Sequence, residues 1–154
     1  MYSRSDSALM RALASGGAAG LASAAVAAAL AAKSGHRPYA VMNAVTHCLW
    51  PDTAPREERV SARYTGTGAG IHLGSAVFWG VLFETLCGRR PSPAKVAASA
   101  ATTSAVAYVV DYHVVPKRLT PGYEAHLSNQ ELALTYVALG AGFALAGLLR
   151  SASR

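Results

Sequence analysis

Two ionisable residues in apolar surroundings, His72 and Asp111, are the pair in this sequence best placed to do chemistry. Each lies in a long apolar stretch, and the two stretches are expected to form antiparallel neighbouring helices, which brings the residues to similar depth. An imidazole beside a carboxylate could hold haem iron or another metal, pass protons to a quinone, or simply form a structural hydrogen bond. Because ionisable groups in a membrane usually turn inward, we expect Asp111 to face the interior of a bundle.

The spacing of the remaining histidines does not indicate a second site. Residues of a helix advance by about 100° each, so Asp111 and His113 lie about 200° apart and cannot share one ion on a regular helix. His36, His47 and His126 fall between the apolar stretches, where we expect exposed side chains. The sequence has no His-x3-His pair and no CxxCH, so we expect neither a preformed zinc site nor covalent haem, and we assign no cofactor.

Glu84 is the other carboxylate within an apolar stretch, and it lies about one turn from the end of that stretch. We expect its side chain to reach toward Arg89 and Arg90 in the following basic turn, because long polar side chains near helix ends extend to the membrane surface. No serine nucleophile motif, phosphate-binding loop or pair of carboxylates accompanies it. The sequence therefore predicts that the protein is not an enzyme.

Four apolar stretches are expected to position these groups, over residues 8–32, 64–87, 93–115 and 131–149. Each is close to the ~20 residues that cross a hydrocarbon core of ~30 Å. Ser128 and Glu131 have capping-box spacing at the start of the last stretch. Residues 38–50 are apolar but too short to span, which is typical of an interfacial helix. We expect an all-α integral membrane bundle of four transmembrane helices with one short interfacial helix, as a single domain over 1–154.

Composition supports a bilayer as the solvent. Only 14% of the residues are charged, against about 25% in soluble domains. The formal net charge is +6, and the basic residues flank the apolar stretches, where anionic lipid headgroups attract them. We therefore expect the lipid bilayer, and no nucleic acid, as the partner of these charges.

Stripes of small residues at four-residue spacing allow helix backbones to approach closely. The first stretch has Gly16 and Gly20 at this spacing. We expect the longer stripes to pack against another helix of the chain, a second copy of the protein or a larger membrane protein. They consist of Gly66, Gly70 and Gly74 in the second stretch and of Ala138, Gly142 and Ala146 in the fourth.

The orientation and the first stretch each leave an alternative open. Lys and Arg divide evenly between the two sides, but the shortest loop contains Arg89 and Arg90, and short loops follow the positive-inside rule best. We expect both termini in the cytoplasm. The first stretch is expected to be a retained helix, although residues 29–31 also fit the pattern of a signal-peptide cleavage site.

The segments 43–50 and 111–124 resemble small bacterial inner-membrane proteins to which no activity is assigned. The resemblance implies a membrane class and no mechanism. The leading hypothesis is a small non-enzymatic accessory or assembly protein of the bacterial inner membrane. The alternatives are a haem-, metal- or quinone-binding redox protein that uses His72 and Asp111, and a small transporter.

Overall fold

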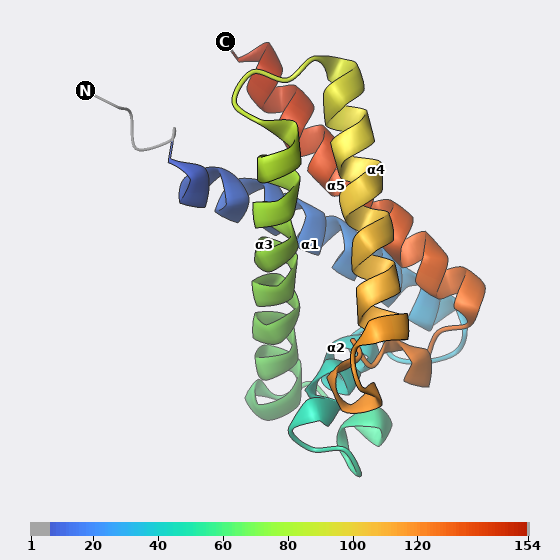
Figure 1. Ribbon diagram of the computed structural model, residues 1–154. Helices are drawn as coiled ribbons and strands as arrows, with labels where there is room; N and C mark the ends of the chain where they lie inside the picture. The colour runs from blue at the N-terminus through green and yellow to red at the C-terminus, as the bar shows by residue number, and fades with distance from the viewer. Residues whose placement is uncertain (1–6, 154) are drawn as a thin grey trace.

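The structure is a computed structural model that describes residues 7–153, and the regular elements of this part of the chain are all helices, without strands (Figure 1). The all-α class is therefore confirmed. The α-helices are α1 (Ala8–Lys33), α2 (Ala40–Val45), α3 (Thr67–Cys87), α4 (Pro93–Val109) and α5 (Asn129–Ala152). A π-helical turn, Ala62–Gly66, leads into α3, and a second one, Val110–Val114, continues α4. Short 3-10 turns occupy Thr46–Cys48, Ala54–Arg56, Lys117–Leu119 and Tyr123–Ala125.

Three helices of the described chain are long and apolar enough to cross a membrane: Ala8–Lys33, Ala62–Cys87 and Asn129–Ala152. They contain three of the four expected spans. The fourth expected span, 93–115, is helical, but α4 has only 17 residues and is rich in Ala, Ser and Thr. Ser92 caps α4, Pro93 begins it, and the expected capping box of Ser128 and Glu131 begins α5.

The helices form a bundle in which α1 crosses behind α3 and continues toward the start of α5 (Figure 1). Glycines permit the closest approaches. A Cβ on Gly16 would lie 2.5 Å from the Val77 Cα, and one on Gly142 would lie 2.5 Å from the Ala19 Cα. Between α3 and α5 the rings of Phe83 and Phe143 stack with their centroids 5.1 Å apart. The core thus lies where α1, α3, α4 and α5 meet.

The glycine stripe of α3 lies outside this core, so of the expected alternatives it does not use packing against another described helix of the chain. A Cβ added at Gly66, Gly70 or Gly74 would meet no atom of a neighbouring element within 4 Å. The opposite face of α3 contacts α1 instead, where a Cβ on Gly80 would lie 2.7 Å from the Ala12 carbonyl oxygen. On α5, Gly142 is buried, while Ala138 and Ala146 are only half-buried.

The expected interfacial helix is helical over Ala40–Cys48, but it is buried in the protein. Val41, Asn43 and Ala44 are fully covered. The Asn43 amide donates to the carbonyl oxygens of Glu57 (2.7 Å) and Arg59 (3.1 Å), and its oxygen accepts a hydrogen bond from Thr65 (2.6 Å). A buried amide with these partners attaches the charged connector to the bundle, which the sequence pattern did not predict.

Candidate functional site

A cavity of about 170 Å³ lies between α3, the π-helical turn after α4, and α5. Segments 119–123 and 45–48 contribute further walls. The polar and aromatic residues that line it are Ser23, His72, Ser75, Trp79, Asp111, Thr120, Tyr123, Thr135 and Tyr136. The structure thus places both sequence-predicted site residues, His72 and Asp111, in the wall of one cavity.

His72 is held by hydrogen bonds on both ring nitrogens. Its Nε2 lies 2.9 Å from the Gly20 carbonyl oxygen and 3.3 Å from the Ser23 hydroxyl, and its Nδ1 lies 2.7 Å from the Tyr123 hydroxyl. A carbonyl oxygen only accepts, so Nε2 carries the proton, and a neutral ring then accepts the Tyr123 proton at Nδ1. Both nitrogens are engaged, and this geometry gives no support to His72 as a ligand of haem iron or copper.

Gly122 places Tyr123 against His72. Its φ of +83° lies in the left-handed region, and an added Cβ would lie 2.4 Å from the Ala44 carbonyl oxygen, so only glycine fits this turn. Tyr123 is buried, and burial together with the nearby Asp111 carboxylate raises the pKa of its phenol above the ordinary value. The phenol therefore keeps the proton that it donates to His72.

Asp111 lies in the π-helical turn Val110–Val114, and its Oδ2 accepts a hydrogen bond of 2.6 Å from the Tyr136 hydroxyl. Its helical neighbour His113 is exposed and packs on Tyr108 with ring centroids 5.6 Å apart. The two residues therefore face different surroundings. Within residues 7–153, Asp111 forms no ion pair with a lysine, arginine or histidine.

The expected direct pairing of His72 with Asp111 is wrong at the level of hydrogen bonds. His72 contacts α1 and the loop before α5, whereas Asp111 contacts α5. The two residues share a cavity and use different partners, because the loop that contains Tyr123 folds back to satisfy the imidazole. Helix spacing predicts a similar depth for both residues, but it does not predict that Tyr123, in the loop before α5, bonds to His72.

Trp79 is a cavity residue that the sequence analysis did not predict for the site. It shares the face of α3 with His72 and is 7% exposed, and its buried indole N–H has no hydrogen-bond partner of normal geometry. The indole interacts with the Asp111 carboxylate. An unpartnered buried donor costs about 1–3 kcal/mol, which a ligand with an acceptor oxygen would recover. The seven-residue spacing from His72 was the available signal for this residue.

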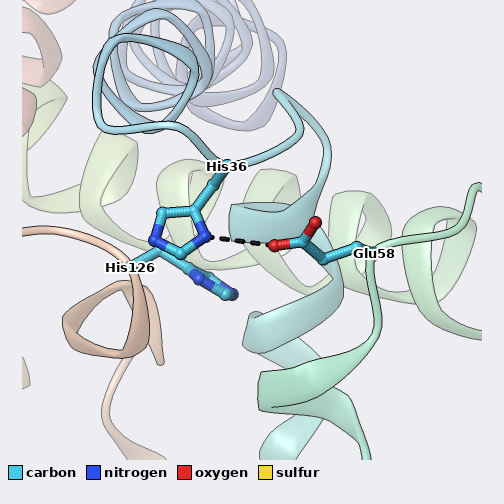
Figure 2. A group of neighbouring side chains, drawn as sticks. All are labelled: His36, Glu58 and His126. Atoms are coloured by element: carbon cyan, nitrogen blue, oxygen red, sulfur yellow. Dashed lines mark hydrogen bonds and ion pairs between the residues drawn. The ribbon is translucent and has the colours of Figure 1, made fainter.

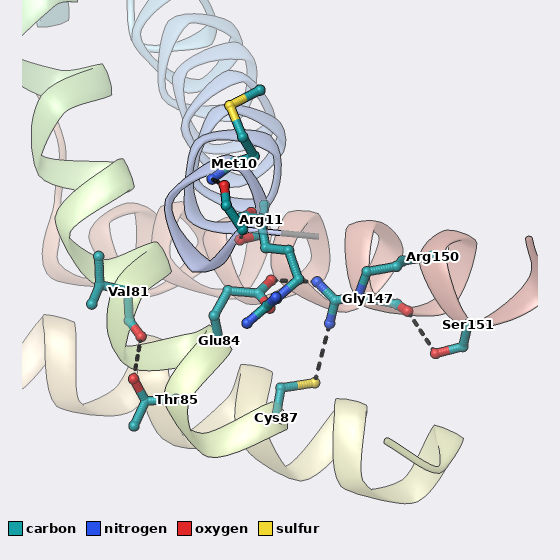
Figure 3. Close-up of polar contacts among 11 residues, drawn as sticks. Met10, Arg11, Val81, Glu84, Thr85, Cys87, Gly147, Arg150 and Ser151 are labelled. Carbon is teal, nitrogen blue, oxygen red and sulfur yellow. Dashed lines mark hydrogen bonds and ion pairs between the residues drawn. The ribbon is translucent and has the colours of Figure 1, made fainter. Parts of the chain in front are cut away.

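Glu84 differs from the expectation that it reaches toward Arg89 and Arg90. It is 4% exposed and binds Arg11 of α1 (3.2 Å) and Arg150 of α5 (2.6 Å) (Figure 3). Arg150 also donates to the Cys87 thiol at 3.8 Å. Figure 3 shows the carboxylate between the two guanidinium groups, so that one side chain of α3 links three helices.

The loop histidines are less exposed than expected. His47 is half-buried, with its ring nitrogens 3.0 Å from the Ala44 carbonyl oxygen and 3.1 Å from that of Lys117. His36 Nδ1 lies 3.1 Å from Glu58 Oε1. His126 is buried, and burial, followed by the neighbouring His36, lowers the pKa of its imidazole.

No protein-family model matches this chain, and no curated protein or solved structure matches it. The resemblance of segments 43–50 and 111–124 to small inner-membrane proteins therefore stays an expectation.

Proposed function

We propose that this chain is a small non-enzymatic membrane protein that binds a lipid-soluble ring compound bearing a hydroxyl group, such as a quinol headgroup, in the cavity beside Asp111. The observation that carries the proposal is the buried Trp79 indole N–H, which makes no hydrogen bond of normal geometry. The same cavity wall contains Asp111, a carboxylate without an ion pair among the described residues. Indole is a donor and carboxylate an acceptor, so one ligand hydroxyl can satisfy both.

The size of the cavity favours a single ring. A cavity of about 150 Å³ lined by apolar side chains holds one benzene molecule, and this cavity measures about 170 Å³. Ile71, Ala76 and Leu139 supply apolar wall for a ring. Few precisely placed polar groups in a mostly apolar wall are typical of small-molecule sites. His72, already bonded on both nitrogens, positions Tyr123 at the edge of the cavity and need not contact the ligand.

The membrane setting is supported by the outer faces of the long helices. Leu21 of α1, Phe78 of α3 and Val137 of α5 are each 66% exposed, and a bilayer would cover them. We propose four spans, in which α4 and its π-helical continuation form the fourth, because α4 runs back beside α3 (Figure 1). We place the protein in a bacterial inner membrane with both termini in the cytoplasm.

The four-span topology is tested by labelling single cysteines with an impermeant thiol reagent in intact cells. In a background without Cys48 and Cys87, Val60→Cys and Lys117→Cys should label from outside and Arg90→Cys only after lysis. All three positions are exposed. If Arg90→Cys and Lys117→Cys label alike, α4 does not cross the membrane.

Ligand binding is tested by thermal unfolding of the detergent-purified protein with a short-chain quinol under anaerobic conditions. A ligand that binds only the folded state stabilises by about 2.7 kcal/mol at one hundred times its Kd. The melting temperature of the wild type and of the control His113→Ala should rise with quinol concentration, whereas Asp111→Asn should respond much less. Equal responses of Asp111→Asn and wild type, or none in either, would contradict binding at this cavity.

An assembly role is favoured by one further observation, the outward-facing glycines 66, 70 and 74 along α3 and the turn before it, which no helix of the described chain covers. Such a surface permits close approach of a second membrane helix. We propose it as the contact with another copy of the protein. Cross-linking in membranes should give a dimer that Gly70→Leu removes, and a Gly70→Leu protein that cross-links like the wild type would exclude this contact.

A further inference from the structure

Three side chains with metal-binding chemistry, none of which lines the cavity, meet where three connections of the bundle converge (Figure 2). They come from separate connections: His36 from the turn after α1, Glu58 from the connector before α3, and His126 from the loop before α5. His36 Nδ1 lies 3.1 Å from Glu58 Oε1, and the rings of His36 and His126 meet edge to face with centroids 4.6 Å apart. One ligand atom from each residue lies within 4.8 Å of the others.

His126 is the residue that points to a ligand. It is 9% exposed, and both of its ring nitrogens are buried without a hydrogen-bond partner. Buried polar atoms are almost always paired, and leaving one unpaired costs about 1–3 kcal/mol. Figure 2 shows the His126 ring lying against His36, next to the His36–Glu58 contact. A structural role for His126 alone leaves both nitrogens unexplained, whereas coordination of an ion would use one of them.

We propose that His36, Glu58 and His126 bind a divalent transition-metal ion of the Zn²⁺ class, with a water molecule at the fourth position. Two imidazole nitrogens and one carboxylate oxygen are an established ligand set for zinc. The side chains of His36 and Glu58 are 35% and 44% exposed, which gives an ion access from water.

The distances are compatible with an ion after a small closure. Metal bonds of ~2.0–2.1 Å in a tetrahedron separate the ligand atoms by roughly 3.3 Å. The His36 and Glu58 atoms are already at this spacing, and the metal would take the place of the hydrogen between them. Only His126 must approach, by roughly 1.5 Å for the widest separation, which lies within the movement of a side chain in a loop.

The ion would join the start of α5 to the end of α1 and to the connector. Ser34 already donates to Glu131 at 3.0 Å across the same α1–α5 contact, so the backbone segments that the ion would join are in place. Metal binding to the folded state alone would raise stability by mass action. The proposed metal site and the quinol cavity have no residue in common.

The test uses the full-length protein in detergent, stripped of metal with a chelator and titrated with Co²⁺ as an absorbing probe, followed by displacement with Zn²⁺. The wild type should bind one equivalent. Removal of even an outer-shell partner of a metal ligand typically costs 10–100-fold in affinity, so removal of a ligand should weaken binding by at least about tenfold. His36→Ala, Glu58→Gln and His126→Ala should all show this loss.

The matched control is His113→Ala, which removes an exposed histidine outside the cluster and should bind like the wild type. Glu58→Gln keeps the test valid if the buried His126→Ala protein fails to fold, since Glu58 is exposed. Less than one equivalent in the wild type, or unchanged affinity in Glu58→Gln, would overturn the site. Equal loss in His113→Ala would show adventitious binding by surface histidines and overturn it too.

Discussion

Glu84 and Asp111 are both carboxylates on helices of the bundle, and their surroundings are opposite. Glu84 has a guanidinium group on each oxygen, from α1 and from α5. Among the described residues, the polar neighbours of Asp111 are hydroxyl and indole groups, and it lies in the wall of a cavity. A carboxylate with fixed counter-ions holds helices together, whereas one with neutral donors and open space beside it retains capacity for a ligand. The burial of a carboxylate therefore does not by itself show whether the residue has a structural role or is available to a ligand.

The largest effect should come from Glu84. Glu84→Gln removes the carboxylate that binds Arg11 and Arg150, and breaking a buried ion pair typically costs about 3–5 kcal/mol of unfolding free energy. Denaturation in detergent measures this loss. Thr85→Ala, an exposed change one residue further along, should shift stability by less than about 0.5 kcal/mol. Equal stability of Glu84→Gln and Thr85→Ala would remove the structural half of the comparison.

A smaller loss should separate the two faces of α3. Gly80→Ala places a Cβ 2.7 Å from the Ala12 carbonyl oxygen, and overpacking of this kind typically costs about 1–3 kcal/mol. Gly70→Ala meets no neighbouring atom and should leave the melting temperature in detergent unchanged or higher, because alanine favours a helix over glycine. A lower melting temperature for Gly70→Ala than for Gly80→Ala would contradict the assignment of the α1 contact to the Gly80 face of α3.

We next expect a coupling free energy of about 1 kcal/mol between His72 and Tyr123. A double-mutant cycle of His72→Ala and Tyr123→Phe should show it, because the Tyr123 hydroxyl donates to the imidazole. The cycle of His72→Ala and Asp111→Asn should be additive within about 0.5 kcal/mol, since each residue has its own partner. Strong coupling in the second cycle would restore the direct pairing that the sequence predicted.

Asp111→Asn should change stability far less than Glu84→Gln. Asparagine keeps an oxygen that accepts the Tyr136 hydrogen bond, and no ion pair is lost among the described residues. Urea or thermal unfolding should show a change of less than about 1 kcal/mol. A loss as large as that of Glu84→Gln would mean that Asp111 is structural as well.

The sequence predicted the local features of this fold well. The apolar stretches 8–32, 64–87 and 131–149 became helices within three residues of their expected ends, and the capping box of Ser128 and Glu131 formed. These features depend on neighbouring residues only. The same is true of placing Asp111 and His113 in different surroundings, which follows from helical periodicity.

The contacts that build the bundle and the proposed sites join distant segments, and no periodicity predicts them. Glu84 binds Arg11 and Arg150, at sequence separations of 73 and 66 residues. The spacing of the α3 glycines predicts a stripe, but it does not predict whether that stripe faces another helix or the outside of the bundle. His126 meets His36 and Glu58 because three loops converge, and their spacing matches no metal motif. Such contacts require the packing of α1 against α3 and α5 to be known first.

The fluorescence of Trp79 reports directly on ligand binding beside Asp111, because this indole lies in the cavity wall. The chain has two tryptophans, so Trp50→Phe leaves Trp79 as the single reporter. Titration with a short-chain quinol under anaerobic conditions should give a saturable change in emission. Asp111→Asn should weaken it by at least about tenfold, as expected for a lost hydrogen bond to a charged group worth about 1.5–3 kcal/mol. No saturable change in the Trp50→Phe protein, or equal affinity after Asp111→Asn, would contradict the account.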